Sequence, residues 1–224
     1  MATTKTLAAK VKSRPFTFLT VAAPHWRKGI RELCLAYAAA FSASDDVRLR
    51  IKSTYDPANS KRHFPFEIPS WDQLLQDCGL KQSVSPCVEL IVETRTDANM
   101  AELYREADVY IGVSWGESFG LAILDAMAIG MPVIVNGWGG HLDFAGKHGD
   151  LVDYDLQPRD DGIYEPVEGA LVAVPRVDLL GERLRWHYDH PESSREWGQR
   201  ARQAVASMTW DAATGQLLKA LSRR

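Results

Sequence analysis

The chain has 224 residues, with 26 lysines and arginines, 29 aspartates and glutamates, and a formal net charge of −3. Hydrophobic residues make up 46% and charged residues 25%, values that exclude disordered, collagen-like and coiled-coil proteins. The length fits one large domain or one domain with an extension, and the near-balanced charge argues against binding nucleic acid through bulk attraction to phosphate.

The N-terminus, before the first strand-like run, is basic. Residues 1–14 carry four basic side chains and no acidic one, but they lack the apolar core of a secretory signal. We therefore expect a flexible basic tail, with a transit peptide as the less favoured alternative. No run of about 18 apolar residues occurs, so no transmembrane segment is predicted. The three cysteines form no Cys-X-X-Cys pair and indicate reduced thiols in a cytoplasmic protein.

The first two thirds of the chain alternate strand-like apolar runs with helical periodicity. In chain order we expect a strand at 16–22, a helix at 27–42, a strand at 47–51, a loop at 54–69, a helix at 70–78, a strand at 87–92, a helix at 99–107, a strand at 109–113, a helix at 119–129 and a strand at 132–135. Alternation with continuous apolar strands predicts an α/β domain whose doubly wound parallel sheet is covered on both faces.

The alternation weakens beyond residue 149. Residues 153–167 are acidic and polar and predict an inserted loop or a short hairpin. A last strand is expected at 170–174, followed by helices at 177–189, 193–206 and 211–221. Asp153 and Asp155 have the spacing of a metal-binding pair, but two aspartates in an acidic loop arise easily by chance, and no metal site is predicted.

The segment that carries chemistry lies around the helix at 119–129. This helix is apolar almost all round, which predicts that it is buried against the sheet, and Asp125 is its single ionisable residue. Glu117 lies where the preceding strand ends, at the edge where open α/β sheets bind ligands. Gly116 and Gly120 let backbone N–H groups approach a ligand, and the helix N-terminus favours an anion such as phosphate. A carboxylate beside it can accept hydrogen bonds from sugar hydroxyls.

Residues 117–134, which contain Glu117 and Asp125 eight positions apart, resemble the E-x7-E motif of the retaining group 1 glycosyltransferases, glycosyltransferase family 4. The similarity continues through Gly139-Gly140, and Arg27-Lys28-Gly29 resembles the family's phosphate-binding Lys-Gly. Trp210-Asp211 resembles the start of the family's last helix. The resemblance implies the GT-B fold, of which this chain would supply the Rossmann-like C-terminal domain.

The resemblance also implies a site for a nucleotide-diphosphate sugar, with no metal and no other cofactor. Glu117 and Lys28 would be the catalytic residues, Glu117 holding sugar hydroxyls and Lys28 neutralising the diphosphate leaving group. The other implied substrate-binding residues are Arg27 near the phosphates, Thr94 and Arg95 at the base, Asp125 at the ribose, and the turn of Ser118, Phe119, Gly120 and Leu121 at the sugar or diphosphate. The leaving phosphate would take the acceptor's proton, so no protein nucleophile is expected.

Two positions depart from the family pattern. Asp125 stands where the family has Glu, and its shorter side chain would favour a water-mediated ribose contact. Ala23 stands where the family has an Arg, which removes a bidentate phosphate clamp and leaves Arg27 or His25 as substitutes.

The expected organisation is a tail at 1–14, a nucleotide-sugar-binding domain at 15–209 and a terminal helix at 210–224 that packs on a missing N-terminal domain. That second half would belong to the same longer chain or to a partner chain, so the isolated domain is expected to be weak or inactive. Attachment of the full-length enzyme at a membrane surface is left open. The alternatives are a non-catalytic subunit of a two-chain transferase and an NAD-dependent oxidoreductase. The oxidoreductase is disfavoured because no G-x-G-x-x-G follows the first strand.

Overall fold

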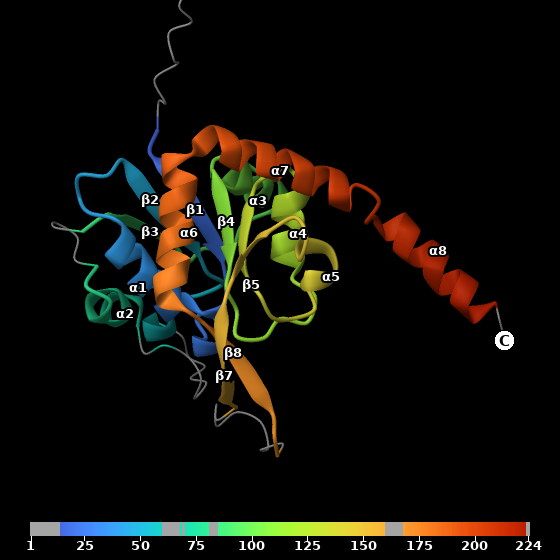
Figure 1. The fold of residues 1–224 in the computed structure, drawn as a ribbon, viewed down its shortest axis with the longest axis horizontal. Coiled ribbons are helices and arrows are strands. Elements are labelled where there is room, and N and C mark those ends of the chain that lie inside the picture. Colours follow the sequence, from blue (N-terminus) through green and yellow to red (C-terminus); the bar gives the residue numbers. More distant parts are fainter. Residues whose placement is uncertain (1–13, 60–67, 69, 81–84, 160–167, 223–224) are drawn as a thin grey trace, which may run out of the picture.

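A parallel sheet of six strands forms the centre of the fold (Figure 1). The computed structural model describes residues 14–59, 68, 70–80, 85–159 and 168–222. The strand order is β3-β2-β1-β4-β5-β6, with bounds β1 (Phe16–Val21), β2 (Val47–Lys52), β3 (Cys87–Ile91), β4 (Val109–Gly112), β5 (Val133–Asn136) and β6 (Asp150–Val152). The chain builds outward from β1 to β3, then crosses back and builds the other half from β4. This is the predicted doubly wound α/β fold, and its order reverses between β1 and β4.

Helices cover both faces of the sheet because the strands carry apolar side chains on both sides. One face packs against α1 (Ile30–Ala40) and α6 (Val177–Asp189), with α2 (Trp71–Asp77) beside them. The other face packs against α3 (Asp97–Arg105), α4 (Leu121–Ala128), α5 (Leu142–Ala145) and α7 (Pro191–Val205). Two separate cores result, as expected for strands that are buried on both faces.

The first helix begins later than the periodicity predicts. Gly29 has φ 68°, the left-handed conformation that favours glycine, and a Cβ there would lie 2.1 Å from the carbonyl oxygen of Val113. The backbone therefore turns at Gly29, and α1 starts at Ile30 instead of residue 27. Arg27 and Lys28 lie on the short 3-10 helix η1 (Trp26–Lys28), which places them on the loop that leaves the edge of the sheet.

The helix predicted to be buried against the sheet is buried on one side and exposed on the other. It is α4, which starts at Leu121 because Gly120, at φ 85°, ends the preceding turn. Ile123, Ala126 and Met127 are buried, whereas Leu121 is 58% exposed and Asp125 is also exposed. The helix packs against the sheet as predicted. Its other side is exposed although, apart from Asp125, it carries apolar residues, which composition alone cannot distinguish from core.

Beyond β6 the chain leaves the main sheet. The expected last strand is β8 (Leu171–Pro175), but it pairs antiparallel with β7 (Tyr154–Pro158) in a separate two-stranded sheet. The hairpin β7–β8 projects from one end of the parallel sheet (Figure 1). Of the two alternatives for 153–167, the described residues thus adopt the hairpin, and 160–167 lie outside the described residues.

A second 3-10 helix, η2 (Pro57–Asn59), lies in the predicted loop 54–69, of which 60–67 and 69 are not described.

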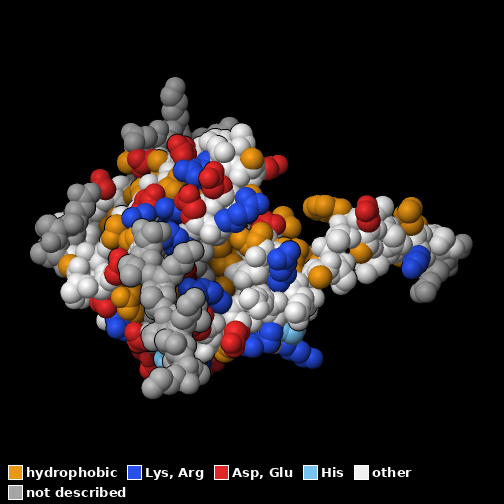
Figure 2. Space-filling model, turned by 90° about the horizontal axis from the view of Figure 1, so that it is seen from above, with side chains coloured by type: hydrophobic (Ala, Val, Ile, Leu, Met, Phe, Trp, Pro, Cys, Tyr) orange, Lys and Arg blue, Asp and Glu red, His pale blue; other side chains and the backbone are white. Residues whose placement is uncertain are grey.

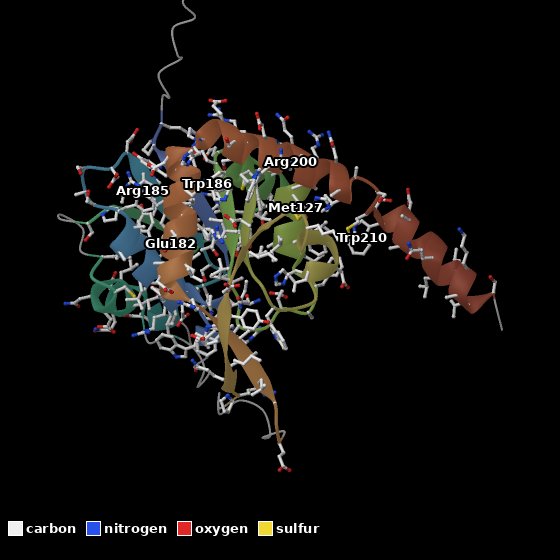
Figure 3. The ribbon with its side chains drawn as sticks, viewed as in Figure 1. Met127, Glu182, Arg185, Trp186, Arg200 and Trp210 are labelled. Carbon is white, nitrogen blue, oxygen red and sulfur yellow. The ribbon has the colours of Figure 1, made fainter. Side chains whose placement is uncertain are left out.

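The last helix, α8 (Trp210–Leu221), extends away from the body and buries none of its residues (Figures 1 and 2). Trp210, at its start, is 82% exposed (Figure 3). Packing of residues 210–224 on a further domain stays a prediction.

Within the described part of the chain, no helix is both long enough and apolar enough to cross a membrane. Of the expected tail 1–14, only Arg14 is described, and its Nη1 lies 2.7 Å from Oδ2 of Asp108.

A buried polar cluster fastens the turn between α6 and α7 to the sheet. His187 is fully buried, its Nδ1 lies 2.7 Å from Oγ of Ser194, and its Nε2 lies 3.4 Å from Oδ2 of Asp150 on β6. No solvent reaches Nδ1, so its hydrogen bond to Ser194 cannot be replaced by bulk water.

We expect Ser194→Ala to lower the free energy of unfolding by about 1–3 kcal/mol, because it leaves Nδ1 of His187 buried without a partner. Urea denaturation followed by circular dichroism measures this. The matched control is Ser193→Ala, since the neighbouring Ser193 is exposed, and its effect is expected to stay within about 0.5 kcal/mol. Equal effects of the two substitutions would contradict the structural role of the cluster.

Candidate functional site

A cleft of about 270 Å³ opens at the carboxyl ends of β1 and β4. This is the point where the strand order reverses, which is the ligand-binding position in open α/β sheets. Its walls come from the end of β1 and the following loop, from the end of β4, and from the turn that leads into α4. The predicted site residues that line it are Lys28, Glu117, Ser118, Phe119, Gly120 and Leu121.

Glu117 and Lys28, which lie 89 positions apart in sequence, form an ion pair inside this cleft. Nζ of Lys28 donates to Oε2 of Glu117 at 2.8 Å, and each side chain is only 20% exposed. The two loops are also joined through the backbone, because the N–H of Trp115 donates to the carbonyl oxygen of Arg27 at 2.8 Å. The predicted catalytic pair is therefore assembled by two loops that follow neighbouring strands.

The carboxylate of Glu117 is held in its ionised form. Burial by itself raises the pKa of Glu117, but the hydrogen bond and charge of Lys28, together with the charge of Arg27, outweigh burial and lower the pKa below its ordinary value. An ionised carboxylate only accepts hydrogen bonds. In this cleft it can take them from Lys28 and from the hydroxyls of a ligand.

The lowered pKa makes the contribution of this ion pair depend on pH. A carboxyl group whose pKa is lower in the folded state stabilises the fold above its unfolded pKa of about 4.3, and the stabilisation is lost as pH falls through the lowered folded value. Glu117→Gln has no such group. We therefore expect the difference in unfolding free energy between wild type and Glu117→Gln, at most about 1 kcal/mol at neutral pH, to shrink as the pH is lowered. Denaturation at a series of pH values measures it, and a difference that grew toward acid would contradict the ion pair.

The N-terminus of α4 points its backbone donors at the cleft. Gly120 occupies the N-cap position and no side chain caps this helix. The carbonyl oxygen of Gly120 accepts from the N–H groups of Ile123 and Leu124, which leaves the earlier amides of the first turn available to a ligand. With Lys28 opposite, this end of the cleft is suited to an anionic group.

A second glycine turn supports Glu117 from behind. The N–H of Gly140 donates to the carbonyl oxygen of Glu117 at 2.8 Å, and a Cβ at Gly140 would lie 1.8 Å from the carbonyl oxygen of Ser118. Gly139 has φ 126°, and a Cβ there would lie 2.9 Å from the same Glu117 oxygen. The backbone can approach this closely only where both residues lack a side chain.

Two buried polar residues behind the glycine turn were missed by sequence reasoning. Asn136, at the end of β5, donates through Nδ2 to the carbonyl oxygens of Ser114 at 2.9 Å and Ala173 at 2.8 Å. Nε2 of His141 lies 2.9 Å from the carbonyl oxygen of Asn136, so Nε2 is the protonated nitrogen, and burial lowers the pKa of His141. Two features of the sequence could have indicated them. Asn136 ends the fifth strand, and His141 directly follows Gly139-Gly140.

Asp125 does not line the cleft. It lies in a separate hollow of about 350 Å³ between α3 and α4, with Asp97 and Tyr104 among its neighbours. Although Asp125 is exposed, partial desolvation in this hollow raises its pKa above the ordinary value. Glu117 and Asp125 thus face different hollows, and contact of Asp125 with a ribose stays a prediction.

The remaining predicted residues lie around the cleft without lining it. Thr94 is exposed and Arg95 is half-buried on the loop after β3, where Nη2 of Arg95 pairs with Oε1 of Glu93 at 2.8 Å. Arg27 lies on η1 beside Lys28 and acts on Glu117 through its charge. Burial, followed by the charges of Arg27 and Lys28, lowers the pKa of His25. Among the residues that the structure describes, no group of three or more His, Cys, Asp or Glu side chains is placed to hold a metal ion.

Comparison with known proteins identifies one matching family and several relatives. A family profile described as "Glycosyl transferases group 1" matches residues 15–160. D-inositol 3-phosphate glycosyltransferase of Corynebacterium glutamicum is 31% identical over 191 residues, which is 85% of this chain and 39% of that protein. The chain therefore spans well under half the length of this relative.

Solved structures agree with the fold. Sucrose-phosphate synthase from Thermosynechococcus elongatus matches with a TM-score of 0.65 and 25% identity, over 94% of this chain and 46% of that one. Anabaena Alr3699/HepE in complex with UDP matches with a TM-score of 0.65 and 19% identity, over 95% of this chain and 50% of that one. Both structures are about twice as long as the region they share with this chain.

Proposed function

The chain belongs to the group 1 glycosyl transferases, and on this premise we propose that it is the donor-binding half of a retaining family 4 enzyme that transfers a hexose-type sugar from a nucleotide diphosphate. The observation that carries the proposal is the Lys28–Glu117 ion pair, set in the cleft beside the uncapped N-terminus of α4. A cation and free backbone donors suit a diphosphate, and an ionised carboxylate next to them suits the hydroxyls of the attached sugar.

In the proposed mechanism the bond between the sugar's anomeric carbon and the diphosphate oxygen breaks, and negative charge develops on that oxygen. Lys28, assisted by Arg27 and by the amides of Gly120 and Leu121, stabilises this charge. Glu117 holds the sugar in place through its hydroxyls. The acceptor's hydroxyl oxygen bonds to the anomeric carbon on the face from which the diphosphate leaves, and its proton passes to the leaving phosphate, so the chain supplies no nucleophile. The proposed mechanism uses no metal.

The rest of the donor extends beyond the cleft. We place the ribose at Asp125, reached directly or through a water, and the base against the loop of Thr94 and Arg95. Ser118 and Phe119 complete the turn that borders the sugar. The acceptor-binding half is supplied by a longer form of this chain or by a partner chain, because the matched relatives are at least twice as long. The isolated chain then binds the donor but transfers little, in a protein that we place in the cytoplasm.

Calorimetric titration tests the proposal. We expect the chain to bind UDP or another nucleoside diphosphate, to bind the corresponding nucleotide sugar more tightly, and not to bind NAD. Binding of NAD without binding of nucleoside diphosphates would favour the oxidoreductase alternative. Binding of neither would contradict the donor site. Co-purification with a second chain that restores transfer would identify the two-chain arrangement.

A further inference from the structure

Glu32 is a buried carboxylate that does not line the cleft. It lies in the first turn of α1, it is 6% exposed, and its Oε2 accepts a hydrogen bond from the indole Nε1–H of Trp115 at 3.2 Å. Burial raises the pKa of Glu32, whereas its own backbone N–H and the indole of Trp115 act in the opposite direction. Burying a carboxylate costs free energy that an apolar side chain at the same position would not cost. The hydrogen bond to Trp115 is the contact that only the polar side chain provides.

Trp115 lies two residues before Glu117, on the loop that follows β4. Its backbone N–H donates to the carbonyl oxygen of Arg27 at 2.8 Å, and its backbone carbonyl oxygen accepts from the N–H of Ala173 on β8 at 2.9 Å. With the indole bond to Glu32, Trp115 is joined to η1, to α1 and to the β7–β8 hairpin. Two of these three bonds reach the chain on either side of Lys28, since Arg27 precedes it and Glu32 follows it by about one helical turn.

The Lys28–Glu117 ion pair depends on how these two segments are placed. Nζ of Lys28 and Oε2 of Glu117 are 2.8 Å apart, and the pair joins the segment before α1 to the loop after β4. A lysine side chain is long and flexible, so holding it in one geometry costs conformational entropy. One hydrogen bond fixes the distance between two segments, whereas two bonds that end at different points also fix their orientation. The bonds of Trp115 to Arg27 and to Glu32 end at two such points.

We propose that Glu32 and Trp115 are positioning residues that hold the Glu117 loop against the Lys28 segment, so that the ion pair keeps the geometry in which it receives the donor. Neither residue lines the cleft, and both act through Lys28 and Glu117. Groups that are already ordered bind more tightly, because less freedom is lost when the ligand arrives. The effect on donor binding rests on the proposed function, whereas the geometry of the ion pair can be measured without any ligand.

The first test follows the pKa of Glu117 by carboxyl ¹³C NMR in the ligand-free chain. The hydrogen bond and charge of Lys28 lower this pKa, so a looser ion pair raises it toward its ordinary value. We expect that rise in Glu32→Leu and in Trp115→Phe, which remove the acceptor and the indole N–H respectively. Glu32→Gln removes the charge but keeps an acceptor oxygen, and the pKa of Glu117 is expected to stay at its wild-type value. Ser194→Ala, which lowers stability far from these loops, is the control and should also leave it unchanged.

The second test measures binding of UDP-glucose to the same variants by calorimetry. Glu32→Leu and Trp115→Phe are each expected to weaken binding by about three- to tenfold, the range that one hydrogen bond contributes. Because both substitutions remove the same bond, the double variant is expected to bind no more weakly than the weaker of the two single variants. Glu32→Gln and Ser194→Ala are expected to stay within about twofold of the wild type. Circular dichroism verifies that each variant is folded.

The outcomes separate this inference from the proposed function. An unchanged Glu117 pKa in both Glu32→Leu and Trp115→Phe would overturn the positioning role, and so would a Glu32→Gln variant that behaves like Glu32→Leu. Equal binding of UDP-glucose by the wild type and by both of these variants would overturn the role in donor binding. If the wild type binds no nucleotide, the proposed function fails, and the pKa of Glu117 by itself decides whether Glu32 and Trp115 position the ion pair.

Discussion

Glu117→Gln is expected to weaken binding of the nucleotide sugar by about 10- to 100-fold while leaving the affinity for the free nucleoside diphosphate nearly unchanged. The carboxylate is assigned to the sugar hydroxyls, and hydrogen bonds to a charged acceptor contribute about 1.5–3 kcal/mol. The amide keeps the shape of the side chain but weakens those bonds. Loss of the charge also breaks the 2.8 Å ion pair between Lys28 and Glu117. The ammonium group of Lys28 stays available to the phosphates. Parallel calorimetric titrations with UDP-glucose and UDP measure the two affinities.

A complementary substitution separates the two roles. Lys28→Met is expected to weaken binding of the nucleotide sugar and of the free diphosphate by similar factors, because the lysine is assigned to the group that both ligands share. Glu182→Gln on α6 serves as the control, since Glu182 is exposed on a helix outside the cleft (Figure 3). If Glu117→Gln instead lowered both affinities equally, the assignment of its carboxylate to the sugar would be contradicted.

Gly140→Ala is expected to lower the free energy of unfolding by about 3 kcal/mol and to remove measurable binding of the nucleotide sugar. The new Cβ would lie 1.8 Å from the carbonyl oxygen of Ser118, a backbone atom that cannot move without displacing the Glu117 turn. Overpacking of this kind costs about 1–3 kcal/mol, and more where backbone must shift. Thermal unfolding and calorimetry measure the two effects.

The matched control for stability is Gly116→Ala, one position before Glu117. A Cβ at Gly116 would meet no atom within 4 Å, so its effect on unfolding is expected to be small. Equal loss of stability in Gly116→Ala and Gly140→Ala would show that the glycine turn does not support Glu117 in the way described here.

Strands β1 to β5 and the position of the cleft could be predicted from the sequence because each signal was local, whereas the short strand β6 was missed. Apolar runs such as Phe16–Val21 and Val133–Asn136 need no tertiary information to indicate buried strands. Glu117 follows the fourth strand at the turn into a helix, and in a doubly wound sheet that position alone predicts the ligand edge. The pairing of Lys28 with Glu117 then follows from strand order, which places β1 beside β4.

What could not be predicted depends on contacts between distant segments. The start of α1 at Ile30 is set by the approach of Gly29 to Val113, which directly follows β4. The outward position of Asp125 follows from which side of α4 packs on the sheet and on α7, and the helix is too uniformly apolar for its sequence to specify that side. The buried bonds of Asn136 to Ser114 and Ala173 join three segments that no local pattern connects.

The most direct measurement of the central claim is an NMR titration of the ¹⁵N-labelled chain with UDP-glucose. A donor bound between Lys28 and the N-terminus of α4 predicts that the largest amide shifts occur at Gly120 and Leu121, with a further shift at Lys28. Shifts confined to other parts of the chain, with these three amides unchanged at saturating ligand, would contradict the account.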